Sequence, residues 1–179
     1  MKIARLIMTY SCGRNCGYCC NKYKSMQRIT KLITKVKEIK DYDIVCITGG
    51  EPLLFPYEVK KLIKKLRQQN PSVVIYLYTT IFRKHMEEII PLVNGIHYTL
   101  HENVSKRDLE QFKLFQQTIK SYLNKSFRLY VYPTNSVQIP IIPNRWKRIE
   151  IKQWISETEL YLPKDETLFY LNDFKEVLK

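Results

Sequence analysis

The chain has 179 residues, of which 45% are hydrophobic and 12% aromatic, with only 5 glycines and 8 prolines. This length and composition predict one globular domain and exclude a disordered or collagen-like chain. The 30 Lys and Arg against 17 Asp and Glu give a net charge of +13, and no apolar run approaches the ~18 residues of a membrane-spanning helix.

Short β-branched or aromatic runs alternate along the chain with longer amphipathic segments. In chain order, the predicted strands cover residues 3–8, 43–48, 73–79, 96–100, 127–132 and 149–154. The predicted helices cover residues 26–39, 56–69, 83–90, from the N-cap Ser105 to about 123, and 165–178. Residues 134–144 carry Pro140 and Pro143, so we expect a loop there in place of the fifth crossover helix.

This alternation is typical of an α/β fold with parallel strands joined by right-handed crossovers. Six strands are fewer than the eight of a closed barrel, so we predict a partial (β/α)6 open barrel. Residues 1–179 would form a single domain, with a core over 3–154 and a C-terminal helix over about 165–178. The active site should lie where the C-terminal ends of the strands meet.

The loop after the first predicted strand contains Cys12, Cys16 and Cys19 in the spacing C-x3-C-x2-C. Three thiolates within eight residues can hold one metal centre and leave a metal position open for another ligand. We expect Gly13 and Gly17 to let the backbone fold tightly around such a centre. The alternative is a zinc site with Cys20 as its fourth ligand.

A second motif, Gly49-Gly50-Glu51-Pro52, follows the second predicted strand. The two glycines suit a strand-to-helix turn, and their bare backbone allows close approach to a ligand. Glu51 either sits as a favourable charge at a helix N-terminus or accepts a hydrogen bond from an ammonium group. We therefore expect Gly50 and Glu51 to serve ligand binding more than folding.

Together these motifs resemble those of the radical S-adenosylmethionine (SAM) superfamily, in a minimal single-domain form. The resemblance implies that Cys12, Cys16 and Cys19 hold an oxygen-sensitive 4Fe-4S cluster. It also implies that residues 49–52 hold the amino group of SAM and that Tyr18 packs near its adenine. In this family the reduced cluster cleaves SAM to methionine and a 5′-deoxyadenosyl radical, which abstracts hydrogen from a substrate.

Three further SAM contacts follow from the same resemblance, each beside a plainer alternative. Thr79 ends the third strand, where it either contacts SAM or caps the strand. His101 follows the fourth strand and either contacts the ribose or lies on a solvated rim. Arg128 lies in the fifth strand and either binds an anion such as the SAM carboxylate or faces the surface.

The resemblance leaves the substrate open between a nucleotide-like small molecule and a protein partner. Asn21 is shared with activases of glycyl-radical enzymes, which are one alternative. A non-enzymatic zinc or nucleic-acid-binding module is the alternative from a different class. A flavodoxin or ferredoxin is the expected electron donor, and the absence of a signal-peptide pattern favours a cytoplasmic location.

The net positive charge has two readings. Lysines on predicted helices usually form a solvated face, whereas a basic rim would attract an anionic substrate or nucleic acid. We expect the substrate to enter beside residues 134–144, where the nearby basic residues are Arg128, Arg145, Lys147 and Arg148.

Overall fold

The computed structural model describes residues 1–135, 140–153, 156–157 and 159–178. Its strands are β1 (Ile3–Thr9), β2 (Lys31–Ile33), β3 (Ile44–Gly49), β4 (Val74–Thr79), β5 (Gly95–Leu100), β6 (Ser126–Val131), β7 (Arg148–Ile151) and β8 (Glu166–Leu171). Its α-helices are α1 (Lys24–Ile29), α2 (Pro56–Gln69), α3 (Lys106–Thr118) and α4 (Phe174–Val177). Short 3-10 helices cover Cys20–Lys22, Val36–Ile39, Pro52–Leu54, Lys84–Leu92, Ile119–Ser121, Pro133–Asn135 and Pro143–Arg145.

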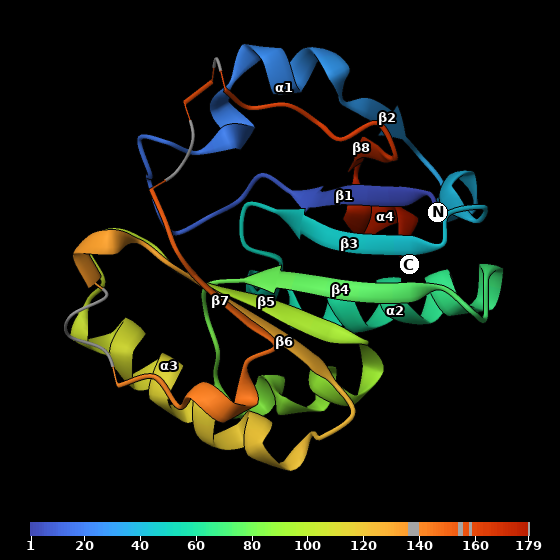
Figure 1. The fold of residues 1–179 in the computed structure, drawn as a ribbon. Helices are drawn as coiled ribbons and strands as arrows, with labels where there is room; N and C mark the ends of the chain where they lie inside the picture. The colour runs from blue at the N-terminus through green and yellow to red at the C-terminus, as the bar shows by residue number, and fades with distance from the viewer. Residues whose placement is uncertain (136–139, 154–155, 158, 179) are drawn as a thin grey trace.

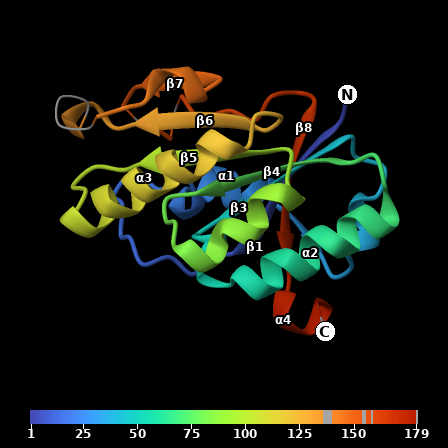
Figure 2. The ribbon, with the colours of Figure 1, turned by 90° about the horizontal axis from the view of Figure 1, so that it is seen from below.

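The strands form one eight-stranded sheet in the order β2-β8-β1-β3-β4-β5-β6-β7, and all neighbours run parallel. β2 and β7 are the edges and do not pair with each other, so the sheet is curved but not closed (Figure 1). In Figure 2, β6 and β7 lie on one side of the molecule and α2 and α4 on the other. The predicted open, parallel α/β barrel is confirmed.

Helix α2 forms where the sequence predicts it. Pro56 occupies the first turn, where a missing N–H costs nothing. Val59, Leu62, Ile63 and Leu66 repeat at helical spacing and are all buried in the main core. The apolar stripe of α2 therefore fixes the helix against the sheet.

The inner strands alternate between two faces, as side chains of a strand must. In β6, Phe127, Leu129 and Val131 are buried in the hydrophobic core, while Arg128 and Tyr130 on the other face are half-buried. We call this second face, which carries Tyr78, His97, Arg128 and Tyr130 on adjacent strands, the interior face. It is rich in polar side chains, which makes it suited to ligands rather than to packing.

The predicted C-terminal helix over residues 165–178 is wrong. Residues 166–171 form strand β8, which lies between β1 and β2, and only Phe174–Val177 are helical. The segment is rich in Thr, Phe and Tyr, which favour strands. The free edge of β1 supplies a row of unpaired backbone groups that β8 satisfies.

The predicted helix over residues 26–39 is also wrong. It divides into α1, the edge strand β2 and a 3-10 helix, with an extended break at Thr30. β-Branched residues at 29, 30, 33 and 34 weaken a continuous helix there. Pairing with β8 stabilises residues 31–33 as a strand instead of a helix. With β2 and β8, the sheet has eight strands rather than the predicted six.

Two smaller differences concern the segments over 83–90 and 149–154. The predicted helix over 83–90 is a 3-10 helix over Lys84–Leu92, and the predicted strand over 149–154 ends at Ile151. Trp154, at the end of that predicted strand, lies outside the described residues. In the described part of the chain, no helix is both long and apolar enough to cross a membrane.

The connection between β6 and β7 is a loop, as predicted, in its described residues 132–135 and 140–147. Gln116 of α3 holds it by donating to the Pro140 carbonyl at 2.9 Å and accepting from the Ile142 N–H at 2.8 Å. Arg145 donates to the backbone carbonyls of Ile119 and Tyr122. These contacts bind the described residues of the loop to α3 and to the 3-10 helix that follows it.

Candidate active site

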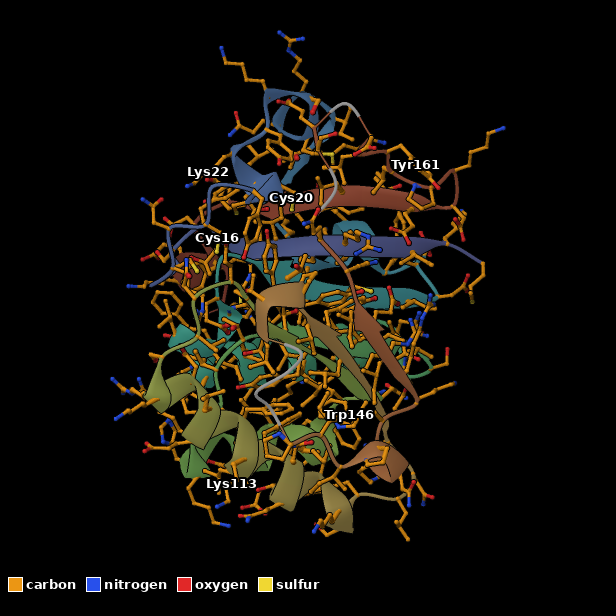
Figure 3. All side chains as sticks on the ribbon, turned by 60° about the vertical axis from the view of Figure 1, so that its left-hand side comes forward. Cys16, Cys20, Lys22, Lys113, Trp146 and Tyr161 are labelled. Carbon is orange, nitrogen blue, oxygen red and sulfur yellow. The ribbon has the colours of Figure 1, made fainter. Side chains whose placement is uncertain are left out.

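A cavity of about 620 Å³ opens at the C-terminal ends of the central strands. Nine of the predicted site residues line it, namely Cys12, Cys16, Tyr18, Cys19, Gly49, Gly50, Glu51, Thr79 and His101. Figure 3 shows Cys16, Cys20 and Lys22 together beside the end of β1, well away from Trp146. The fold thus brings segments from four different strand ends to one cavity, as the sequence predicted.

Two side-chain contacts hold the cysteine loop over this cavity. Asn21 donates from Nδ2 to the carbonyl of Gly49 at 2.7 Å, joining the loop to the end of β3. Arg14 forms an ion pair with Asp108, which also belongs to the capping box of α3. The loop is therefore fixed at both ends to different parts of the barrel.

The two glycines of the second motif allow the chain to pass close to the cysteine loop. Gly49 has a φ of +126°, a conformation that L side chains rarely adopt. A Cβ on Gly50 would lie 2.2 Å from the carbonyl oxygen of Ser11. The Gly50 N–H instead donates to the Thr9 carbonyl at 2.6 Å. Gly50 is thus required for packing, in addition to the ligand role that the sequence predicts for it.

Glu51 is 2% exposed and ties the end of β3 to the end of β4. Its Oε1 accepts from the Leu53 N–H at 2.9 Å and the Thr79 hydroxyl at 2.8 Å. Its Oε2 accepts from the Thr80 N–H at 2.8 Å. Burial raises the pKa of Glu51 to about 7, although these three hydrogen bonds favour the carboxylate. Both Glu51 and Thr79 therefore have structural partners at the cavity wall.

Tyr18 closes one wall of the cavity. Its ring stacks on those of Tyr132 and His101, with centroids 5.4 and 6.2 Å apart, and its hydroxyl accepts from the Glu102 N–H at 3.0 Å. His101 Nδ1 lies 3.8 Å from the sulfur of Cys16. Burial lowers the pKa of His101 to about 4, so the imidazole is neutral beside the thiol. The sequence did not predict this contact, because residues 16 and 101 are far apart in the chain.

The three loop cysteines have the donor set that an iron–sulfur cluster needs. Cys12 is exposed and Cys16 and Cys19 are half-buried, all on the same cavity. Over residues 1–135, 140–153, 156–157 and 159–178, no three His, Cys, Asp or Glu side chains converge on a single ion. A 4Fe-4S cluster takes one thiolate per iron, so its ligands stand apart from one another. Three thiols around a cavity of this size fit that requirement.

Gly13 and Gly17 are not required by the protein's own packing. Neither has a positive φ, and a Cβ on either would meet no atom within 4 Å. Cys20 also lines the cavity, and burial raises the pKa of its thiol. Pro52 and Arg128 are the predicted site residues that do not line this cavity.

A second cavity of about 260 Å³ adjoins the first and shares several of its lining residues, including Arg5 and Lys152. Arg5 forms an ion pair with Glu166 of β8, and its guanidinium lies 5.8 Å from the centre of the Tyr78 ring. Lys152 pairs with Glu150 at 2.7 Å. Arg5 was not predicted as a cavity residue, because its partner Glu166 lies on a strand that was predicted to be a helix.

Comparison with known proteins gives one family and one set of distant structures. The family model of the radical SAM superfamily matches residues 6–124. A crystal structure of BtrN in complex with AdoMet and 2-DOIA is 14% identical, with a TM-score of 0.48, and covers 72% of this chain and 56% of that one. A selenomethionine crystal structure of BtrN in an open conformation is 18% identical, with a TM-score of 0.43, and covers 62% and 53%.

The chain thus spans little more than half the length of the BtrN chains. A search of the curated proteins found no match.

Proposed function

The chain belongs to the radical SAM superfamily, and on that premise we propose that it is an enzyme that uses a 4Fe-4S cluster to cleave SAM reductively. The observation that carries this proposal is the single cavity shared by three loop cysteines and the Gly49–Glu51 segment. Cys12, Cys16 and Cys19 would hold the cluster. When bound, the cluster and SAM supply a 5′-deoxyadenosyl radical that abstracts hydrogen from the substrate.

The protein's own residues would position these groups and limit access of water. The backbone at Gly49 and Gly50, with Pro52 behind it, forms the side of the cavity against which the amino group of SAM would lie. Tyr18 and His101 form the wall expected for the adenine and ribose. The neutral imidazole of His101 can donate a hydrogen bond to the Cys16 thiolate, an interaction that tunes iron–sulfur centres.

Asn21 does not favour the glycyl-radical-enzyme activases as the specific group. In this structure its amide holds the Gly49 carbonyl, which explains an asparagine at this position by the fold alone. Asn21 therefore does not identify the substrate, and the residues of the barrel interior are the ones to examine for substrate binding.

The test is anaerobic purification followed by incubation with SAM and dithionite. We expect a brown protein with absorbance in the blue region, about 4 iron per chain, and formation of 5′-deoxyadenosine. Alanine in place of Cys12, Cys16 or Cys19 should abolish iron binding or SAM cleavage. Cys20→Ala is the matched control in the same loop and should retain both.

A colourless wild-type protein that binds one zinc would overturn the proposal in favour of a structural zinc site. Bleaching by Cys20→Ala, with retention of iron in one of the other three variants, would show that the ligand set is wrong.

A further inference from the structure

The interior face carries a group of buried polar atoms that find no partner among the described residues. They are both ring nitrogens of His97, Nε of Arg128 and Oγ of Ser126. His97 and Arg128 are directly opposite each other on β5 and β6, and Ser126 is two residues before Arg128 on the same face. Because native proteins satisfy nearly all buried polar groups, several orphan atoms in one place need an explanation.

The ring of His97 lies immediately behind the wall of the large cavity. The His97 ring is 3% exposed, and its centroid lies 4.2 Å from that of Tyr78 and 6.0 Å from that of Tyr130. Both tyrosines line the 620 Å³ cavity. His97 therefore packs against two tyrosines that line the cavity, and the register of β5 and β6 places Arg128 beside it.

Among the cations of the interior face, Arg128 stands apart. Arg5 and Lys152 line the cavity, but each has a carboxylate partner, Glu166 and Glu150 respectively. Arg128 is half-buried and has neither an ion pair nor a hydrogen bond within the described part of the chain. The Nε of Arg128 is buried without a partner, which is costly for a charged group, so an anion within its reach would relieve that penalty.

His97 does not add a second positive charge. Burial lowers its pKa to about 3, and the neighbouring guanidinium groups of Arg128 and Arg5 act in the same direction. It is a neutral imidazole with one N–H donor and one acceptor. A donor beside an unpaired guanidinium is the combination that recognises the oxygens of a carboxylate or a phosphate.

We propose that Arg128, with His97 beside it, binds an oxyanion group of the substrate, a carboxylate or a phosphate, which enters between Tyr78 and Tyr130. The assignment of this group to a substrate rests on the proposed radical SAM function, whereas anion binding itself can be measured independently. It gives Arg128 a role different from the SAM carboxylate contact expected from the sequence. With its oxyanion bound at Arg128, the substrate would extend its reacting part toward the loop cysteines.

The test uses imidazole NMR signals, because the chain has only 3 histidines. Cluster-loaded protein is titrated with sodium phosphate or sodium acetate, against sodium chloride at equal ionic strength. We expect one of the two oxyanions to shift the His97 signals in a saturable manner. His85, which is exposed, serves as the internal control and should not shift beyond its change in chloride. Saturation by phosphate alone identifies a phosphate site, and saturation by acetate alone or by both identifies a carboxylate-compatible site.

Two variants test the role of Arg128. Arg128→Met keeps the aliphatic stem and removes the charge, and we expect binding to weaken at least about tenfold. Lys113→Met makes the same charge change at an exposed side chain on α3 and should leave binding unchanged. Thermal unfolding provides a second readout, since the oxyanion should raise the melting temperature of the wild type but not that of Arg128→Met.

Equal affinity in Arg128→Met and wild type, or His97 signals that respond no more than in chloride, would overturn the proposal. The same samples are assayed for SAM cleavage. Protein that cleaves SAM but binds neither oxyanion refutes only this inference. Protein that binds an oxyanion through Arg128 but does not cleave SAM refutes the proposed function instead.

Discussion

At the scale of single residues, Gly50 shows how a motif can serve the fold and the site together. Its position against the Ser11 carbonyl leaves no room for a side chain. We expect Gly50→Ala to destabilise the protein by about 1–3 kcal/mol, as overpacking does, and to lower the iron content because the cysteine loop is displaced. Urea unfolding and iron analysis measure the two effects.

Gly13→Ala is the matched control, since a Cβ there meets nothing within 4 Å. It should change stability by less than about 0.5 kcal/mol. A stable, iron-loaded Gly50→Ala protein that had lost only SAM affinity would show that Gly50 serves ligand binding more than folding.

His97 provides a prediction about pH. Its pKa in the folded state is about 3, below the ordinary value of 6.5, so the unfolded chain takes up a proton first as the pH falls. The contribution of neutral His97 to the free energy of unfolding is fully present above pH 6.5. It should fall by about 2 kcal/mol by about pH 5.

His97→Phe keeps an aromatic ring among Tyr76, Tyr78 and Tyr130 and removes this dependence along with two orphan nitrogens. In phosphate-free buffer it should be at least as stable as wild type at about pH 8 and clearly more stable at about pH 5. His101 is present in both proteins, so its own titration cancels. Parallel pH curves for the two proteins would contradict the depressed pKa.

At the scale of elements, strand β8 changes the interior of the barrel. It brings Glu166 to Arg5 of β1, a contact that a helix over residues 165–178 would not place in register with β1. We expect Glu166→Gln to cost about 1–3 kcal/mol, because it leaves the Arg5 guanidinium without its charged partner. Denaturant unfolding measures the loss.

Glu110→Gln, at an exposed position on α3, makes the same chemical change away from any such pair and should be close to neutral. Equal stabilities of the two variants would mean that β8 does not hold Arg5 in solution.

At the scale of the whole molecule, the net charge of +13 bears on the electron donor. A flavodoxin is an acidic protein, and long-range attraction between opposite charges speeds encounter. We expect flavodoxin-driven formation of 5′-deoxyadenosine to fall by roughly tenfold between about 0.05 and 0.5 M sodium chloride, because salt shortens the range of electrostatic attraction.

Dithionite-driven formation is the control and should change much less over the same range, since a small reductant needs no protein docking surface. If both reactions respond equally to salt, the positive charge reflects composition rather than docking of a donor.

The local patterns of the sequence determined the parts of this protein that depend on neighbours in the chain. The spacing of Cys12, Cys16 and Cys19 and the Gly49–Pro52 segment predicted the family, and apolar periodicity predicted α2 with its bounds. Both signals are local, because a loop motif and an amphipathic helix each lie within one continuous segment of the chain. The open parallel barrel followed from strand–helix alternation for the same reason.

Tertiary structure alone decided the rest. Residues 31–33 and 166–171 contain residues that favour strands, but they become strands because each completes backbone hydrogen bonds with a strand distant in sequence. The same holds for His101 beside Cys16, Gly50 against Ser11 and His97 opposite Arg128, pairs whose members are separated by between 31 and 85 residues. Periodicity can place these residues on a strand or loop, but only packing brings them into contact.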